Sequence, residues 1–286
     1  AIQSIFLFRL FFGKRKLLAT FHTDNFQYLK ILFGVPYFFS KWLHRIVFGN
    51  FSRIISVSDY CKNLLVQAGL KNCDGIWSGG LDTQLFHPEK RSESVRQSLL
   101  QTGEHTLALH VGRLSREKGI DRLVPLFAES KARGVRWVIV GDGDDREALE
   151  AAAQGFPVTF VGKKYGDELA ALYASADFFA FPSTTDTFGL VVVEAMSSGI
   201  PVVAFNHGAV PNLIRHGDDG LIVKNTDEAL LEGFIQLAEN ASQRTLLGTN
   251  ARAVLANKWA WSSSVQYLLD LVEPQSVPSQ VQSAAK

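Results

Sequence analysis

The sequence predicts an α/β protein with two doubly wound, Rossmann-like domains, of which the first is incomplete in this chain. Three observations support this class. The 286 residues suffice for about two domains. A hydrophobic content of 47% against 20% charged residues is typical of a globular protein with a sizeable core. Short apolar runs alternate with helical patterns from about residue 106 onward, whereas only two such runs precede them.

The second domain is predicted from six apolar runs that each come before a helical pattern. In chain order they are LALHV (107–111), WVIV (137–140), VTFV (158–161), FFAF (178–181), PVVAF (201–205) and LIV (221–223). Short β-rich runs that alternate with helices predict parallel strands joined by crossovers. The ligands of such a domain are expected at the carboxyl ends of its strands.

The first hundred residues show fewer elements. Strand candidates are LLATF (17–21) and RIISV (53–57), with helical patterns around 25–50 and 59–69. These are too few strands for a complete α/β domain. The segment that follows, 87–105, is polar and charged and predicts a linker with a short helix.

Three regions are therefore expected. Residues 1–100 form a partial first domain with its linker, 101–262 form a complete second domain, and 263–286 form a closing helix with a disordered tail rich in Ser, Gln and Pro. Because the sequence begins at Ala1 without a Met, we expect that it lacks residues that precede it.

Composition excludes several classes of function. A net charge of +1 gives no overall attraction to nucleic acid. Cys61 and Cys73 match no zinc or redox spacing, so a reducing, cytoplasmic compartment is expected. No two histidines lie three or four residues apart, so no helical metal site is indicated. The apolar start of the chain differs from a signal peptide because its charges follow the apolar part.

Charge is uneven along the chain. Residues 1–50 contain seven Lys or Arg but one acidic residue, Asp24, and aromatic residues are interleaved with the basic ones. One interpretation is a core segment with solvated charges. The other is a patch that lies on an anionic membrane surface. No apolar run approaches the ~18 residues that a spanning helix needs.

The loop VGRLSREKG (111–119) follows one predicted strand. Gly112 allows a sharp turn, and Arg113 and Lys118 lie five residues apart. Two cations beside a helix N-terminus suit a pyrophosphate, through charge-assisted hydrogen bonds to its oxygens. The alternative is that both are solvated surface charges.

The loop GDGDDREAL (141–149) follows the next strand and has two interpretations. Asp142 and Asp144 form a D-x-D pattern of the kind that holds a metal ion in some sugar-nucleotide enzymes. Alternatively, Asp144 and Glu147 form a capping pattern that opens a helix. We favour capping and expect no metal and no cofactor.

Two carboxylates bracket an apolar run in TTDTFGLVVVEAM (184–196). Asp186 and Glu194 lie eight residues apart, after the predicted strand FFAF. In one interpretation the two acids only suit their places in a helix, with Asp186 near its N-terminus and Glu194 exposed to solvent. In the other interpretation both carboxylates face one ligand. His22, in FHTD (21–24), also follows a predicted strand and is either a structural residue or a ligand contact.

Together these motifs resemble the retaining family 4 glycosyltransferases of the two-domain GT-B fold. The resemblance runs from about residue 17 to residue 272. The motifs, in the family's order, are FHTD, ISVSDYCKNLL, GGLDTQLFHP, HVGRLSREKG, VGDGDDREAL, LYASADFFAFPST, TDTFGLVVVEAMSSGIPVVA and WAWSS. The combination TFG-x-VV-x-EAM with HTD is most similar to the branch that acts on lipids and cell-envelope glycans.

The resemblance implies a role for each residue. Arg113 and Lys118 match the pair that neutralises the donor diphosphate, at the loop that Gly112 opens. Glu194 matches the acid that holds the ribose, and Asp186 the acid that touches the transferred sugar. The backbone amides around the sugar and phosphate correspond to those of Phe188, Gly189 and Leu190. The histidine of the acceptor-side domain that reaches the donor sugar corresponds to His22.

The sequence departs from the family in three places. Asp186 stands where the family usually has Glu, which shortens its reach by one methylene. Gly79 stands where Asn or Arg is common. Roughly the first half of the family's first domain, with its glycine-rich loop, has no counterpart here.

The implied activity is transfer of a hexose from a nucleotide diphosphate sugar, UDP-hexose or GDP-mannose, to a hydroxyl of a lipid or envelope glycan. Configuration would be retained by front-face attack, since no covalent nucleophile is evident. The partners implied are the donor, the acceptor and an anionic membrane surface, with the protein cytoplasmic or peripheral on the inner face of the membrane. A sugar-nucleotide epimerase and a non-catalytic nucleotide-sugar-binding module stay open as alternatives.

Overall fold

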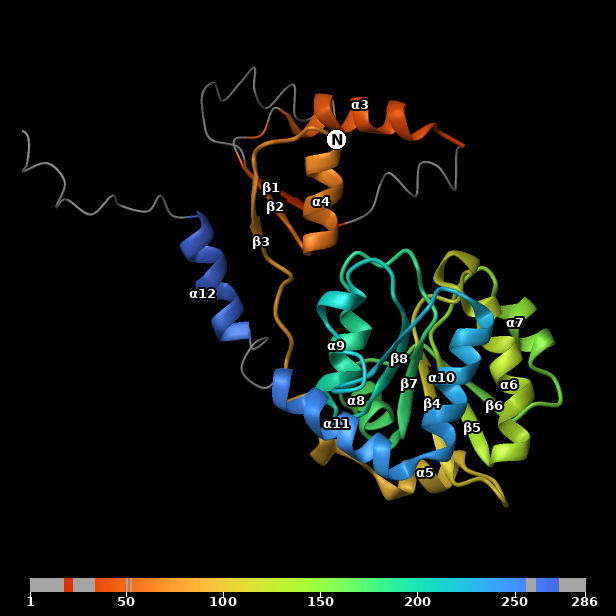
Figure 1. The fold of residues 1–286 in the computed structure, drawn as a ribbon. Helices are drawn as coiled ribbons and strands as arrows, with labels where there is room; N and C mark the ends of the chain where they lie inside the picture. The colour runs from red at the N-terminus through yellow and green to blue at the C-terminus, as the bar shows by residue number, and fades with distance from the viewer. Residues whose placement is uncertain (1–17, 23–33, 50, 52, 256–260, 273–286) are drawn as a thin grey trace, which may run out of the picture.

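The computed structural model describes residues 18–22, 34–49, 51, 53–255 and 261–272. Two separate parallel sheets organise them, each with its own helices (Figure 1). The first sheet has the order β1-β2-β3, formed by β1 (Leu18–Phe21), β2 (Arg53–Ser56) and β3 (Cys73–Ile76). Helices α3 (Tyr37–Phe48) and α4 (Asp59–Gln67) connect these strands. The two-sheet α/β class predicted from the sequence is confirmed.

The second sheet contains six parallel strands in the order β6-β5-β4-β7-β8-β9. They are β4 (Thr106–Val111), β5 (Val135–Val140), β6 (Val158–Gly162), β7 (Phe178–Phe181), β8 (Val202–Phe205) and β9 (Leu221–Val223), each at a run predicted from the sequence. The chain builds outward from β4 to β6, then returns to the other side of β4 with β7. This reversal is a topological switch point, where such sheets bind ligands.

Helices cover both faces of the second sheet (Figure 1). The α-helices are α5 (Glu93–Leu99), α6 (Val124–Ser130), α7 (Arg146–Ala152), α8 (Gly166–Ser175), α9 (Leu190–Ser197), α10 (Asp227–Glu239) and α11 (Ala241–Leu255). Short 3-10 helices are η1 (Pro88–Lys90), η2 (Arg116–Lys118), η3 (Ile120–Leu123), η4 (Lys131–Arg133) and η5 (Val210–Asn212).

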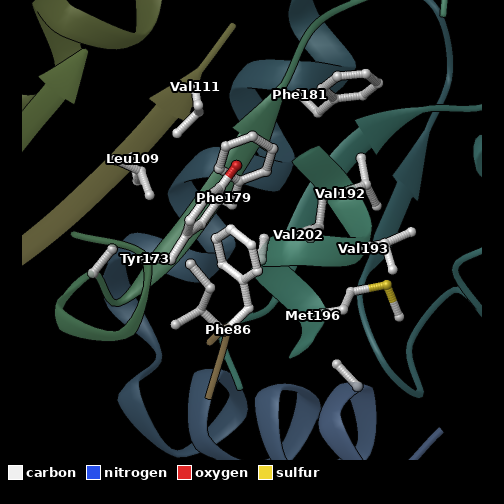
Figure 2. Close-up of a cluster of buried hydrophobic side chains, with 14 of the residues drawn as sticks. Phe86, Leu109, Val111, Tyr173, Phe179, Phe181, Val192, Val193, Met196 and Val202 are labelled. Carbon is white, nitrogen blue, oxygen red and sulfur yellow. The ribbon is translucent and has the colours of Figure 1, made fainter. Parts of the chain in front are cut away.

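The side-chain alternation of the central strands builds one core on each face. In β7, Phe179 and Phe181 join one buried cluster, whereas Phe178 and Ala180 join the other. Successive residues of a strand point to opposite faces, so a strand that is apolar throughout is buried on both. Figure 2 shows the first of these clusters, in which α8 and α9 pack against β4 and β7.

The predicted linker is not a free connection. The short helix expected within 87–105 is α5, but its Arg96 is buried against the second domain. The Arg96 guanidinium donates to Ser175 O (2.7 Å), to the Asp177 carboxylate (2.9 Å) and to His105 O (3.0 Å). These bonds fix the segment on the six-stranded unit.

The closing helix, α12 (Trp261–Val272), begins two residues before its predicted start and lies beside β3 rather than beside the second sheet (Figure 1). Trp77 Nε1 donates to Ser264 O (3.0 Å), and Ser264 Oγ donates to Gly79 O (2.6 Å). The predicted disordered tail lies outside the described residues. Within the described ranges, no helix combines the length and apolar character needed to cross a bilayer.

Candidate donor-binding site

Three loops meet at the carboxyl ends of the central strands. They follow β4 (112–119), β7 (182–189) and β8 (206–209). Gly119 has φ 73°, and a Cβ there would lie 2.4 Å from Pro182 O. Thr185 Oγ1 donates to Glu117 O at 3.0 Å, and a Cβ on Gly208 would lie 2.7 Å from Asp186 O. The close approaches require glycine at both positions and hold the loops together at the switch point.

Lys118 and Asp186 form an ion pair across two of these loops. Lys118 Nζ lies 3.0 Å from Asp186 Oδ1, and the two side chains are 19% and 25% exposed. Their partial burial strengthens the pair compared with one in open solvent. The structure thus brings together a cation from the first predicted motif and a carboxylate from the third.

Arg113 is directed elsewhere. Its guanidinium lies 2.8 Å from Glu117 Oε1, and more than half of its side chain is exposed. Ser115 Oγ donates to the same carboxylate oxygen at 2.7 Å. Glu117 was missed by sequence reasoning, although its position four residues after Arg113 is the spacing of a local ion pair. Glu117 therefore fixes the orientation of Arg113 at the edge of the site.

Glu194 is buried, with 8% of its surface exposed, on helix α9. Tyr173, from α8, donates its hydroxyl hydrogen to Glu194 Oε2 at 2.9 Å. Burial raises the pKa of Glu194 to about 7, and the hydrogen bond from Tyr173 opposes that rise. The interpretation of Glu194 as a solvent-facing helix residue is therefore wrong.

The start of α9 also excludes a capping role for Asp186. The helix begins at Leu190, and its N-cap is Gly189 in the left-handed conformation (φ 88°, ψ 54°). Phe188 precedes it and packs against the core clusters of both sheets. Leu190 is half exposed. The first turn of a helix presents unpaired backbone N–H groups, so this turn can receive an anionic or hydroxyl ligand.

Similarity to known proteins covers the part of the chain that carries these loops. Residues 91–254 match the family model described as Glycosyl transferases group 1. The chain belongs to this family. It is 36% identical over 194 residues to the sulfoquinovosyl transferase SQD2 of Arabidopsis thaliana, covering 66% of this chain and 38% of that protein.

Two further similarities extend the comparison. The chain is 35% identical over 220 residues to a GDP-mannose-dependent alpha-mannosyltransferase of Mycobacterium tuberculosis, covering 77% of this chain and 55% of that protein. It also shares its fold with Anabaena HepE in complex with UDP and glucose, with a TM-score of 0.78, 23% identity, and coverage of 95% of this chain and 75% of that chain. The chain spans about half the length, or less, of these two curated relatives.

In this group 1 glycosyltransferase chain the second predicted motif has a structural function. Gly141 and Gly143 let the loop after β5 approach the loop after β4, because a Cβ on Gly141 would lie 1.8 Å from Gly112 O. Gly112 N donates to Val140 O at 3.0 Å. Gly112 is thus held in place by the neighbouring strand.

The capping interpretation of Asp144 is wrong. Helix α7 begins at Arg146, and its N-cap is Asp145, whose side chain makes no capping bond. The Asp145 carboxylate instead accepts from Arg116 N at 2.7 Å, which ties this loop to the one after β4. Asp142 Oδ1 accepts from Gly143 N at 3.0 Å. Across the described residues, no three His, Cys, Asp or Glu side chains are grouped so that they could hold a metal ion.

His110 was missed by sequence reasoning because it lies within an apolar strand. It is 2% exposed, and its Nδ1–H donates to Ala180 O at 3.1 Å. The ring stacks on Phe179 at 6.3 Å between centroids. Burial lowers the pKa of His110 to about 4, so the imidazole is neutral. The ring lies next to Gly112, since a Cβ on that glycine would be 3.6 Å from His110 Nε2.

His22 follows β1, with its side chain exposed. Its backbone oxygen accepts from Thr187 Oγ1 at 2.6 Å, and Ser58 Oγ donates to Thr187 O at 2.6 Å. The loop that carries Asp186 and Phe188 therefore touches the first sheet directly. A neighbouring cavity of about 400 Å³ is lined by both units and α12, through Val57, Ser58, Asp59, Trp77, Phe188, Leu213 and Tyr267 among others.

Proposed function

We propose that the protein transfers a hexose from a nucleotide diphosphate sugar to a hydroxyl of a lipid or cell-envelope glycan, with retention of configuration. The observation that carries this proposal is the ion pair between Lys118 and Asp186 in the loops at the switch point of the sheet, together with the buried carboxylate of Glu194 on α9. The name of one relative, a GDP-mannose-dependent alpha-mannosyltransferase, supports a nucleotide-sugar donor, and that of the other, a sulfoquinovosyl transferase, supports transfer of a sugar.

The donor diphosphate is assigned to Arg113 and Lys118, beside Gly112. Both cations lie in the loop after β4, and Lys118 pairs with Asp186 of the loop that leads into α9. The N-terminus of a helix such as α9 also favours phosphate. As the bond between the anomeric carbon and the phosphate oxygen breaks, negative charge develops on the leaving diphosphate. A well-placed cation stabilises such charge by roughly 3 kcal/mol. We therefore expect no requirement for a metal ion, and activity should persist in excess EDTA.

The two acids receive different parts of the donor. Glu194 accepts hydrogen bonds from the ribose hydroxyls, and Asp186 from a hydroxyl of the transferred sugar. Backbone N–H groups of Phe188, Gly189 and Leu190 surround the sugar and phosphate. His22 reaches the sugar from the opposite unit, consistent with the contact between its backbone and Thr187.

Transfer occurs on one face of the sugar. The acceptor oxygen forms a bond to the anomeric carbon on the side from which the diphosphate departs. The acceptor proton passes to the departing phosphate oxygen, so no protein base or covalent intermediate is needed. Catalysis then depends on positioning, where misplacement by about 1 Å costs roughly a hundredfold in rate.

Helix α3 suits a membrane surface that presents a lipid acceptor. Its Phe38, Phe39, Trp42 and Ile46 are exposed and share one face, whereas Ser40 and His44 are buried on the other. Lys41 lies beside this face, with its Nζ over the ring of Tyr37, whereas the Arg45 guanidinium donates to Ala68 O at the end of α4. An amphipathic helix with aromatic residues and basic neighbours binds anionic interfaces. We propose that the protein is peripheral on the membrane through this helix.

The donor and the reaction type are tested together. Binding of UDP-glucose and GDP-mannose is measured by calorimetry, and the donor that binds is then offered with a mixture of envelope lipids. A glycolipid product with the anomeric configuration of the donor, seen by NMR, is the expected result. Release of free sugar or of an epimerised nucleotide sugar without a glycolipid would contradict the proposal.

A further inference from the structure

The phenol of Tyr173 is fixed in orientation by its neighbours. The side chain is fully buried on α8, with its ring centroid 5.7 Å from both Phe86 and Phe179. Figure 2 shows the hydroxyl of Tyr173 pointing toward the end of the cluster where Val111 and Phe181 lie. Those two residues end β4 and β7, so the hydroxyl points toward the edge of the sheet that carries the site loops.

We propose that Tyr173 is a positioning residue for donor binding: its hydroxyl holds Glu194 Oε2, so that the carboxylate presents Oε1 to the ribose hydroxyls of the nucleotide sugar. The geometric basis is the 2.9 Å hydrogen bond between two side chains that are both buried. The inference rests on the proposed function, because it assigns the ribose to Glu194. The alternative is that Tyr173 is a core residue whose hydroxyl does nothing for the ligand.

The hydrogen bond has an electrostatic consequence. Burial raises the pKa of Glu194 to about 7, and the bond from Tyr173 favours the ionised form. Burial, followed by the nearby charge of Glu194, raises the pKa of Tyr173 well above its ordinary value, so the phenol stays a donor at neutral pH. The bond from Tyr173 therefore increases the fraction of Glu194 that is ionised near neutral pH, against the larger effect of burial.

Other charged groups around α9 are engaged elsewhere. Lys118 pairs with Asp186 on the preceding loop. Arg252, from α11, donates to Ser197 O and Oγ at the far end of α9. His110, from β4, stacks on Phe179 and donates to Ala180 O, and its pKa is lowered to about 4 by burial. Tyr173 is the titratable partner of Glu194 in the described part of the site.

The test is the pH profile of nucleotide-sugar affinity. UDP-glucose and GDP-mannose serve as probes because their diphosphates carry no group that titrates between about pH 5.5 and 8.5. Affinity in the parent should rise with pH through about 7, since the ionised carboxylate is the stronger acceptor. In Tyr173→Phe the midpoint should move to higher pH by roughly 0.5 to 1, and affinity at pH 7 should fall roughly threefold to tenfold.

Three matched variants isolate the hydroxyl. Glu194→Gln should flatten the profile, which separates this titration from that of any other group. Adding Tyr173→Phe to Glu194→Gln should then change affinity little, because the two residues act through one bond. Phe86→Leu disturbs the packing of the same ring but leaves the hydroxyl, so its midpoint should match that of the parent.

The outcomes are distinct. A Tyr173→Phe protein that binds with the parent's midpoint, or a double variant whose loss is the product of the two single losses, would overturn the role given to Tyr173. A folded parent that binds neither nucleotide sugar at any pH would instead overturn the proposed function, and this role with it. A raised midpoint with a non-additive double variant supports both.

Discussion

The two sheets differ in how completely they are covered. In the six-stranded sheet, β4, β5, β7 and β8 are buried along their whole length, and apolar clusters pack on both faces. In the described part of the three-stranded unit a smaller cluster packs around Phe21, Ile54 and Leu65. Its helix α3 leaves Phe38 75% exposed and Trp42 55% exposed. Among the residues that the structure describes, the first unit thus has a smaller core than the second, and α3 presents apolar side chains to solvent.

This difference separates two tasks. Loops that hold the candidate donor site stand on a sheet whose position is fixed by packing on both sides, so their charges can be held in one arrangement. The first unit is held by contacts from elsewhere in the chain, including Thr187, Phe188 and helix α12. Chemistry is expected on the six-stranded unit, and surface association on the three-stranded one.

The largest expected effect tests the chemical role that the comparison gives to the six-stranded unit. Lys118→Ala removes the cation that lies 3.0 Å from Asp186 and is assigned to the leaving diphosphate. Turnover should fall roughly a hundredfold or more. Lys164→Ala is the matched control, because Lys164 also pairs with an acid, Glu168, but on the exposed surface of the same unit. Equal turnover by both variants, measured with saturating donor, would refute the assignment.

The six-stranded unit could be predicted well from the sequence because its strands are apolar on both faces. Each of the six runs, such as WVIV and FFAF, became a strand at the expected place. Strand β3 could not be predicted from CDGI, since Asp and Gly are poor strand residues. Its Gly75 packs against Leu271 of α12, a contact between distant parts of the chain.

The candidate site was predictable only in part. The sequence placed Asp186 and Glu194 near the carboxyl end of β7, because a parallel strand with a polar loop marks that edge. The pairing of Lys118 with Asp186 depends on how two loops meet, which no local pattern encodes. His110 and Tyr173 were missed because a single polar residue among apolar neighbours is usually interpreted as a structural residue of the core. Asp144 was misassigned because Asp142, Asp144 and Asp145 are all acceptable residues before a helix, and the helix begins after Asp145.

A second prediction sharpens the comparison through the stability of the covered unit. His110 has a pKa of about 4 when folded, below its ordinary value of 6.5, because burial disfavours its charged form. The unfolded chain therefore binds more protons between these values, and the free energy of unfolding falls as pH drops from 6.5 to about 4. This group accounts for up to about 3 kcal/mol of the loss.

His110→Phe keeps an aromatic ring on Phe179 but removes the titration. Urea unfolding of both proteins should show a difference between variant and parent that changes in favour of the variant as pH falls from about 7 to about 4.5. At pH 7 the variant should be the less stable, because Ala180 O loses its donor. A difference that is constant with pH would show that the buried imidazole does not titrate as inferred.

The smallest expected effect concerns the exposed unit. Lys41 lies on α3 beside the aromatic face, with Nζ 4.5 Å from the ring centroid of Tyr37. The other basic residues of the predicted N-terminal patch, apart from Arg45, lie outside the described residues.

If α3 rests on anionic lipid, a basic residue near that surface contributes about 1 kcal/mol, so Lys41→Gln should weaken binding to phosphatidylserine-containing vesicles roughly fivefold. The effect should shrink with added salt, because counterions screen the attraction. Lys71→Gln is the control, since Lys71 is exposed on the same unit but is not part of α3. Vesicles of neutral lipid should not distinguish the three proteins. Equal losses from Lys41→Gln and Lys71→Gln on anionic vesicles would mean that net charge, and not this helix, brings the protein to the membrane.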